Sequence, residues 1–407
     1  MKIYIIMTAS ITKVGGAQLY TNSKRQFMEA RGWKVDVVSS SKGTAMLPEL
    51  TQYQYHINED LEVFPYHYTK HKCKSILKRI EEKFEGNNEI IIESHNTIMH
   101  VWGELLAFRL QAKHVVYEIT ERSRCTKGLY PFFKFKFERK EMAGIQDSSL
   151  NYYFKGFMDV PVSQRYCLIA HYFSKQVDDV PYDTTVIPVS SAMCTIGILG
   201  RLQKPFVMEV AKQVSEYVKN DTNNKYTVII IGGQKDGDSY ISNIESLFSG
   251  ISNVNLFFTG YLFPIPQKLV SLIDIGISSS GAVITLANEG VPTIAIDAHD
   301  LQPLGVYGIT TDDVLYRKDD TIVPLSEWIK RIQTTPDAFR METKQVTINE
   351  DVFNHHLDFI NNSSKEVEYY TDFRRSSQII NRLLVTILGA KVFRSLRKNI
   401  KRTLLPL

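Results

Sequence analysis

The sequence has few cysteines and no long hydrophobic runs. Its four cysteines stand far apart, at positions 73, 125, 167 and 194, without the close pairing of metal ligands. This spacing argues against a disulfide framework and favours a reducing compartment, so we expect a cytoplasmic protein. The apolar start, residues 1–7, is too short for a signal-peptide core. The longest apolar run, residues 383–390, is about one third of a membrane span, so any membrane contact is expected to be peripheral.

The composition is that of an ordinary globular protein. With 407 residues the chain is longer than one hydrophobic core usually supports, so two α/β domains are expected. Apolar residues make up 43% and charged residues 23%, which argues against extensive disorder. The net charge is only +4, yet six cations follow one another near the C-terminus without an intervening acid: Lys391, Arg394, Arg397, Lys398, Lys401 and Arg402. The basic excess therefore belongs to the tail.

Strand-like apolar runs alternate with helical patterns along most of the chain, and this alternation is typical of βαβ units. The expected strands are residues 3–7, 34–38, 89–92, 114–119, 194–199, 226–231, 254–258, 273–277 and 293–296. Most of them are apolar throughout, as in parallel sheets that are covered on both faces. We expect two Rossmann-like domains, at 1–180 and 181–365, followed by closing helices and a basic tail at 366–407.

A turn in the second half is typical of anion-binding sites. Gly200 and Arg201 follow an apolar strand, and Lys204 comes just before a helix. Because open α/β sheets bind ligands at the carboxyl ends of their strands, these cations are expected to neutralise a diphosphate. The plainer alternative is a solvated basic loop.

A second turn of the same half passes through small residues. Ser279, Ser280 and Gly281 connect a strand with an apolar helix, whose first N–H groups lack partners inside the helix and favour a phosphate. Glu289 lies about two turns further along, near the helix end. Serine as a helix N-cap and Gly290 as a C-cap explain the same residues, and both interpretations can hold together.

The first half offers a glycine turn and three candidate catalytic side chains. Gly15 and Gly16 follow the first strand and precede a helix, so the backbone can approach a phosphate or sugar there, although glycine also favours an ordinary turn. His95, Glu118 and Glu121 each stand at the carboxyl end of an expected strand. Any of them can serve as a general base. The alternatives are a hydrogen-bonded turn histidine and glutamates at helix starts.

Two segments combine apolar and basic side chains. Residues 130–140 interleave aromatic rings with cations, which fits either a membrane surface or a helix whose rings pack inward. In the tail, at about 100° per residue, Val392, Phe393, Leu396 and Ile400 share one face and the cations share the other. This pattern favours a helix lying on an anionic membrane over one that binds nucleic acid. The expected membrane contacts are Lys391, Phe393, Arg394, Arg397, Lys398, Lys401 and Arg402.

Together these motifs resemble the retaining glycosyltransferases of family four, which have the GT-B fold of two Rossmann-like domains facing across a cleft. Gly15 and Gly16 look like the glycine-rich first loop of that family. Gly200 and Arg201, with Lys204 two positions early, look like its donor-diphosphate segment. The resemblance covers most of the chain, and it implies that the final helices cross back to the first domain.

The chain departs from the family's pattern at two motifs. The family's two glutamates, eight positions apart, correspond to Ile277 and Thr285, and Glu289 is out of register. The family's active-site histidine corresponds to Thr120. The stereochemical outcome of transfer therefore stays open, because Glu118 or Glu121 can equally act as the base of an inverting enzyme.

The resemblance implies a glycosyltransferase at the inner face of the plasma membrane. It would move a sugar from a UDP- or GDP-linked donor to a lipid-linked or polysaccharide acceptor in bacterial surface polysaccharide (capsule) synthesis. Arg201 and Lys204 would hold the diphosphate without a metal ion. Two alternatives remain: a non-catalytic subunit of the same fold that binds membrane or a partner glycosyltransferase, and a sugar-nucleotide epimerase.

Overall fold

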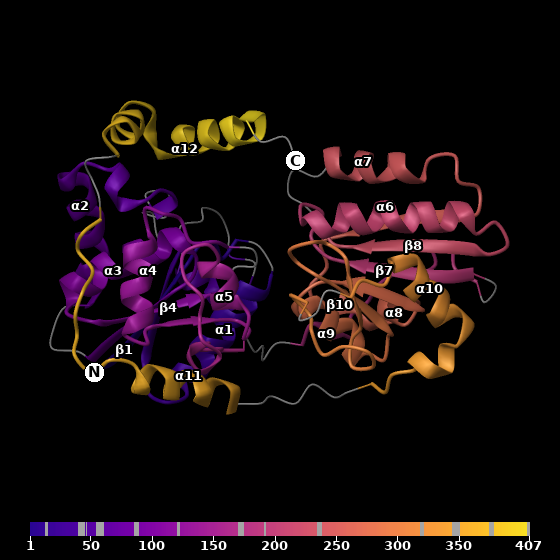
Figure 1. The fold of residues 1–407 in the computed structure, drawn as a ribbon, viewed down its shortest axis with the longest axis horizontal. Coiled ribbons are helices and arrows are strands. Elements are labelled where there is room, and N and C mark those ends of the chain that lie inside the picture. Colours follow the sequence, from indigo (N-terminus) through magenta and orange to yellow (C-terminus); the bar gives the residue numbers. More distant parts are fainter. Residues whose placement is uncertain are drawn as a thin grey trace. The chain divides into compact units, whose positions relative to one another are not determined.

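The chain divides into two compact units in the computed structural model (Figure 1). The described residues are 1–12, 15–39, 45, 47–53, 61–84, 89–119, 123–169, 175–190, 193–233, 238–317, 321–343, 351–373 and 378–404, without the side chains of residue 238 and residues 398–404. Met1–Ser174 and Ile348–Leu407 form the first domain, and Lys175–Thr347 form the second. The final helices therefore rejoin the first domain, as expected.

The second domain ends earlier than the expected border at residue 365. Helix α11 (Asp351–Asn362) already belongs to the first domain. Its Phe353 ring lies 5.1 Å from the ring of Phe27, and its His356 is fully buried. Packing of this apolar face against the first domain is the physical reason for the shifted border.

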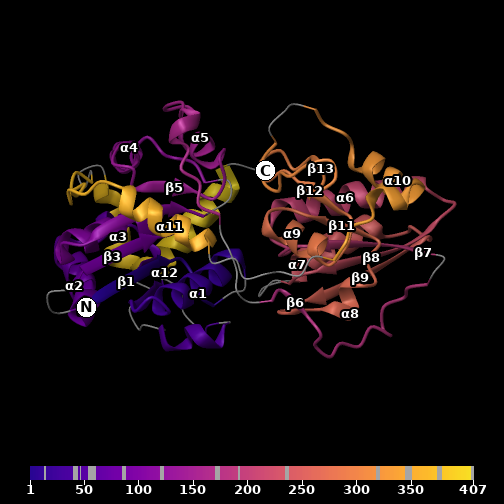
Figure 2. The same ribbon diagram turned by 90° about the horizontal axis from the view of Figure 1, so that it is seen from below.

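The first domain is built on a parallel five-stranded sheet in the order β2-β1-β3-β4-β5. Figure 2 shows β1, β3 and β5 of this sheet among the helices of the domain. Its strands are β1 (Lys2–Thr8), β2 (Lys34–Ser39), β3 (Glu89–Ser94), β4 (Lys113–Glu118) and β5 (Met142–Gly144). Its helices, besides α11, are α1 (Gly16–Glu29), α2 (Lys70–Glu81), α3 (Thr97–Leu110), α4 (Tyr130–Glu138), α5 (Ser149–Phe154) and α12 (Ile379–Leu404). Short 3-10 turns are η1 (Pro48–Tyr53), η3 (Pro65–His67), η4 (Glu82–Phe84) and η5 (Val162–Gln164).

The two faces of this sheet differ in chemistry. Ile3 and Ile5 of β1 belong to an apolar core that also contains side chains of α2, α3 and α12. Tyr4, between them, points to the other face, because side chains alternate along a strand. There it lies against Lys24 of α1, whose Nζ is 5.5 Å from the tyrosine ring centroid. The face under α1 therefore holds buried polar groups, and the opposite face is the hydrophobic core.

Helix α4 settles the alternatives for residues 130–140. Phe132, Phe133 and Phe137 are buried in a core shared with β5 and α5. Lys136 is buried as well, at 1% exposure. The rings pack inward, so this segment is a core helix and not a membrane surface.

The second domain is built on a six-stranded sheet in the order β13-β12-β11-β7-β8-β9. Its strands are β7 (Met193–Leu199), β8 (Lys225–Ile231), β9 (Val254–Gly260), β11 (Ile275–Ser278), β12 (Thr293–Ile296) and the antiparallel edge strand β13 (Pro303–Val306), and a small second sheet pairs β6 (Val177–Asp178) with β10 (Ile265–Pro266). Its helices are α6 (Pro205–Asn220), α7 (Asp238–Phe248), α8 (Gln267–Val270), α9 (Gly281–Asn288) and α10 (Leu325–Thr334), with the 3-10 turn η6 (Pro336–Phe339). Helices α6, α7 and α10 cover one face, since their apolar side chains share a core with β7 and β8.

Helix α12 differs from the expected membrane helix in one side chain. Phe393 is only 2% exposed, and its ring lies 5.4 Å from that of His67. The prediction that Phe393 contacts a membrane is therefore wrong, because this residue anchors the helix to the first domain. Lys391, Arg394 and Arg397 are exposed, whereas the side chains of Lys398, Lys401 and Arg402 lie outside those that the structure describes. Nowhere in the described part of the chain is a helix both long and apolar enough to cross a membrane.

Candidate functional site

The carboxyl edge of the second-domain sheet brings the two expected anion-binding turns together. Ser278, the last residue of β11, pairs in register with Leu199, the last residue of β7. The Ser278 hydroxyl donates a hydrogen bond of 2.6 Å to the Leu199 carbonyl oxygen. Arg201 follows β7 and Ser280 follows β11, and these two strands are neighbours in the sheet. The two turns therefore begin about 4.8 Å apart, the usual distance between paired strands.

The turn that carries Arg201 is packed closely against two glycines that follow β8. A Cβ atom added to Gly232, which has φ 149°, would lie 2.1 Å from the Gly200 carbonyl oxygen. One added to Gly233 would lie 2.7 Å from the Tyr261 backbone nitrogen. Backbone therefore packs directly against backbone at the ends of β7, β8 and β9, next to the half-buried Arg201.

The start of α9 has unused hydrogen-bonding capacity. Ser280 occupies the N-cap position with φ 65°, in the left-handed region, and its side chain makes no capping hydrogen bond. The Oγ of Ser279 is buried and has no hydrogen-bond partner in the structure. The serine N-cap interpretation thus fails for the side chains. A buried hydroxyl and an uncapped helix start can instead bind an anion.

Glu289 lies at the other end of α9. It is the C-cap residue, roughly 13.5 Å along the helix axis from Ser280. Burial raises the pKa of its carboxyl group, against the opposing effect of a hydrogen bond with Gln267. The sheet edge therefore gathers Arg201, Lys204 and Gly281, but not Glu289.

In the first domain, His95 follows β3 at the corresponding edge. Its backbone N–H donates to the carbonyl of Met7, which places it beside the end of β1. The side chain is 1% exposed, and its Nε2 lies 2.9 Å from Oε1 of Glu93. Its Nδ1 is buried without a hydrogen-bond partner in the structure.

Glu93 is the centre of a buried polar cluster. It accepts hydrogen bonds from the hydroxyls of Tyr4, at 2.6 Å, and Tyr20, at 2.8 Å. The fully buried Nζ of Lys24 lies 3.8 Å from Oε2 of Glu93. Burial alone raises the pKa of the Glu93 carboxyl, but Lys24 and His95 outweigh it and hold the pKa far below its usual value. Glu93 is therefore ionised.

The ionised carboxylate fixes the tautomer of His95. Since Glu93 can only accept, Nε2 of His95 donates this hydrogen bond, and in the neutral ring the lone pair is then on Nδ1. A carboxylate that orients an imidazole in this way leaves the other nitrogen ready to take a proton. Of the candidate bases that the structure describes, His95 is therefore the one held by a carboxylate at one ring nitrogen, with the other nitrogen unpartnered.

Glu118 belongs to a different buried network. It ends β4 at 3% exposure, and its Oε2 lies 3.4 Å from Nε2 of His100. The chain of contacts continues from His100 Nδ1 to the Ser94 hydroxyl, at 2.8 Å, and from there to Nε2 of His114, at 2.7 Å. His114 in turn contacts Glu104. Glu121 lies outside the described residues.

The glycine turn is less specific than expected. Gly15 is the N-cap of α1 with an extended backbone, φ 174°, which any residue adopts. A Cβ atom there would lie 3.1 Å from Oε1 of Gln18, a tight contact with the end of a flexible side chain. Gly16 begins the helix, whose first turn contains no acidic residue. An N-terminus free of acids remains compatible with anion binding.

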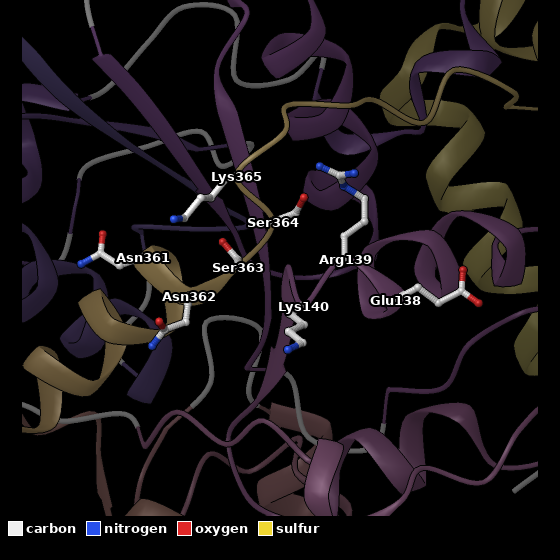
Figure 3. A pocket seen from close by; sticks show the side chains of 8 residues that line it. All are labelled: Glu138, Arg139, Lys140, Asn361, Asn362, Ser363, Ser364 and Lys365. Atoms are coloured by element: carbon white, nitrogen blue, oxygen red, sulfur yellow. The ribbon is translucent and has the colours of Figure 1, made fainter.

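An open pocket of about 520 Å³ lies at the opposite edge of the first-domain sheet (Figure 3). It is lined by Glu138, Arg139, Lys140, Asn361, Asn362, Ser363, Ser364 and Lys365. Lys113, the first residue of β4, donates to the Ile360 carbonyl beside it, so the pocket lies at the amino ends of the strands. Arg139 is already paired with Glu141 and Glu368. Both observations argue against a ligand site there, because α/β sheets bind ligands at their carboxyl edge.

Similarity to known proteins is confined to three-dimensional structure. No family model matches the chain, and no curated protein matches it in sequence. A glycosyltransferase from Rickettsia africae matches over 96% of this chain and 98% of its own, with a TM-score of 0.55 and 12% identity. Anabaena HepE, solved in complex with UDP, matches over 96% of this chain and 100% of its own, with a TM-score of 0.51 and 11% identity. A TarM variant from S. aureus, solved with UDP, fondaparinux and alpha-GlcNAc-glycerol, matches over 89% of this chain and 100% of its own, with a TM-score of 0.50 and 12% identity.

The chain has the GT-B fold. At these identities the likeness establishes architecture and not activity. The expected fold of two Rossmann-like domains is confirmed over nearly the whole chain. Among the residues that the structure describes, no three histidine, cysteine, aspartate or glutamate side chains gather as metal ligands do.

The sequence interpretation missed the partners of His95. Glu93 ends an isoleucine run in a strand buried on both faces, and a single charge in such a run signals a buried ion pair. Lys24 gave a weaker signal, since lysines are common in helices. Their pairing depends on the sheet that brings α1 against β3.

Acid is expected to destabilise the first domain, because it contains buried neutral histidines. Burial lowers the pKa of His67 and of His114 to about 4 and that of His356 to about 3. These values lie below the unfolded value of 6.5, so the unfolded state binds protons first. Stability is therefore complete above pH 6.5 and falls toward pH 4, by up to about 1.4 kcal/mol per pH unit and histidine. Urea unfolding at pH 7.5, 6 and 5 measures this loss of stability. An unchanged unfolding midpoint would contradict the conclusion that these histidines are buried and neutral.

Proposed function

We propose that this protein is a glycosyltransferase that uses a nucleotide-diphosphate sugar. The observation that carries the proposal is the pairing of two turns at one sheet edge of a GT-B fold: the Arg201 turn and the uncapped start of α9 with its buried Ser279 hydroxyl. A diphosphate fits this arrangement, because guanidinium, ammonium and helix N–H groups all bind phosphate oxygens. UDP in two similar structures favours a UDP-linked donor.

Individual residues receive these roles in the proposal. Arg201 and Lys204 bind the diphosphate, and Ser279, Ser280 and Gly281 bind a phosphate or the ribose. Glu289 remains a candidate contact for the nucleoside, further along α9. The same cations and N–H groups stabilise the departing diphosphate, so we expect transfer to continue in the presence of a metal chelator.

The acceptor side is assigned to the first domain. His95 is the proposed general base for the acceptor hydroxyl, Glu118 and Glu121 are the alternatives, and Gly15 and Gly16 shape the acceptor side. We propose a lipid-linked or polysaccharide acceptor of bacterial surface polysaccharide synthesis, at the inner face of the plasma membrane. The cationic end of α12 supports that location.

Donor binding tests the proposal directly. Isothermal titration of the folded protein with UDP, GDP and their sugars should show heat with at least one of them. Arg201→Gln should weaken that binding by roughly 10- to 100-fold, because about 1.5–3 kcal/mol is lost with a hydrogen bond to a charged group. Lys219→Gln on α6 is the matched control, since Lys219 is exposed near the other end of the helix, and it should bind as the wild type does.

Product analysis separates the alternatives. Mass spectrometry should detect a sugar transferred to an added acceptor, whereas an epimerase consumes the donor without one. Absence of heat with every nucleotide would overturn the proposal and favour a non-catalytic subunit.

A further inference from the structure

The outer face of α12 is apolar. Eight of the eighteen large apolar side chains that are exposed in the described part of the chain belong to this helix. Six of them lie before its bend and are named the apolar band: Ile379, Ile380, Leu383, Leu384, Ile387 and Leu388. Their exposed fractions range from 36% to 75%. A monomeric soluble protein rarely leaves such a continuous row uncovered.

The band occupies one half of the helix. Its members recur at i, i+1, i+4, i+5, i+8 and i+9, which at about 100° per residue places all six within roughly 180°. Val385 lies outside this arc and is buried, at 4% exposure. The helix thus presents one apolar side to its own domain and a second, wider one to its surroundings.

The helix is held in place on its inner side. Val385 and Phe393 belong to the apolar core of the first domain. Arg394 lies 2.6 Å from Glu62, and α12 contacts η3. Figure 1 shows α12 lying along the outside of the first domain, near α2. The apolar band is therefore a fixed outward surface and not a frayed end.

Charge decides among possible occupants of the band. From residue 373 to residue 407 the sequence contains nine cations and no acid. A second copy of the chain would bring two such sets together, which is electrostatically unfavourable. An anionic bilayer offers both an apolar interior and negative headgroups, and so it complements the band and the cations at once.

We propose that α12 docks in the plane of an anionic lipid bilayer, with the apolar band in the acyl region and Lys391 and Arg397 among the headgroups. The bend at Gly389, with φ 76° and ψ 160°, separates these two parts of the helix. The inference rests on the proposed membrane location but not on sugar transfer. It also replaces the expected contact through Phe393 by a surface about one and a half to four turns earlier in the chain.

Vesicle flotation tests the docking surface. The full-length protein is mixed with vesicles of phosphatidylcholine alone or with phosphatidylglycerol added, and bound protein is measured at low and high salt. Wild type should float with the anionic vesicles. Ile380→Asp with Ile387→Asp, at the two most exposed band positions, should reduce binding at least tenfold. Lys391→Gln with Arg397→Gln should weaken binding to anionic vesicles and remove most of its salt dependence.

The matched control places two aspartates elsewhere. Val162 and Val186 are 77% and 59% exposed and lie outside α12, so Val162→Asp with Val186→Asp should float as wild type does. The inference is overturned if wild type ignores anionic vesicles, if the band variant floats undiminished, or if the band variant instead abolishes a dimer seen by light scattering. UDP titration of the same variants should be unchanged, so failure of docking and failure of donor binding are distinguishable.

Discussion

Replacing Glu104 with glutamine is expected to lower the free energy of unfolding of the first domain by roughly 3–5 kcal/mol, as happens when one partner of a buried ion pair is removed. Glu104 is fully buried, and its Oε2 lies 2.7 Å from Lys136 Nζ and 2.6 Å from His114 Nδ1. Its Oε1 accepts a 2.7 Å hydrogen bond from the backbone N–H of Tyr370. Neutral glutamine removes a carboxylate that balances Lys136 and weakens the attachment of the returning chain.

The effect should depend on pH in a defined direction. Burial raises the pKa of Glu104, but Lys136 and His114 outweigh it and bring the pKa to about 2. Since the usual value is 4.5, the charge of Glu104 contributes its full stability above pH 4.5 and loses it as the pH falls toward 2. The difference in the free energy of unfolding between wild type and Glu104→Gln should therefore reach its full size at pH 7, where it is measured by urea unfolding.

A surface glutamate on α4 provides the control. Glu138 pairs with Lys134 at 3.6 Å, and the side chains are 62% and 48% exposed. Glu138→Gln should change stability by less than about 0.5 kcal/mol. Glu104→Gln should also cost less when Lys136 is methionine, because no buried ammonium is then left behind. An equal cost in both backgrounds would show that the two side chains are not coupled.

The sheets could be predicted from the sequence, because their strands are continuous apolar runs. Residues 194–199 and 226–231 became β7 and β8 with little change in their bounds. Strand β5, with three residues, and the edge strand β13, whose four residues include a proline and a glycine, were not predicted, since neither forms a continuous apolar run. That the Arg201 and Ser279 turns lie at the same edge of one sheet also followed from sequence, because parallel strands all end at one edge. That β11 lies next to β7 is known only from the sheet order.

Side-chain partners could not be predicted in the same way. Glu93 meets Lys24 and His95 only after β3 and α1 pack together. Helical periodicity placed Phe393 on an apolar face but could not tell whether that face meets the domain or its surroundings. The same ambiguity explains the shifted domain border, because the sequence does not show which domain the apolar face of α11 packs against. In the structure it packs against the first domain, where Nδ1 of His356 lies 3.2 Å from the hydroxyl of Tyr20.

Replacing His95 with glutamine is expected to reduce kcat by roughly 10²- to 10⁴-fold, the range for loss of a general base. The reason is the bare Nδ1 of His95, which glutamine does not reproduce as a base. Affinity for UDP, measured by titration, should stay within twofold, because Arg201 and the start of α9 belong to the second domain. His71→Gln is the control: His71 is an exposed histidine on α2, and its replacement should leave turnover unchanged.

Glu93→Gln tests whether the carboxylate positions that base. Glutamine can accept through its oxygen but no longer balances Lys24, so kcat should fall while UDP affinity is kept. The buried lysine also makes the variant less stable, so turnover must be compared below its unfolding temperature. Tyr4→Phe removes one hydrogen bond from Glu93 and leaves its contact with His95, and it should retain most of the activity. Full turnover in His95→Gln would exclude His95 as the base and leave Glu118 and Glu121 as the candidates.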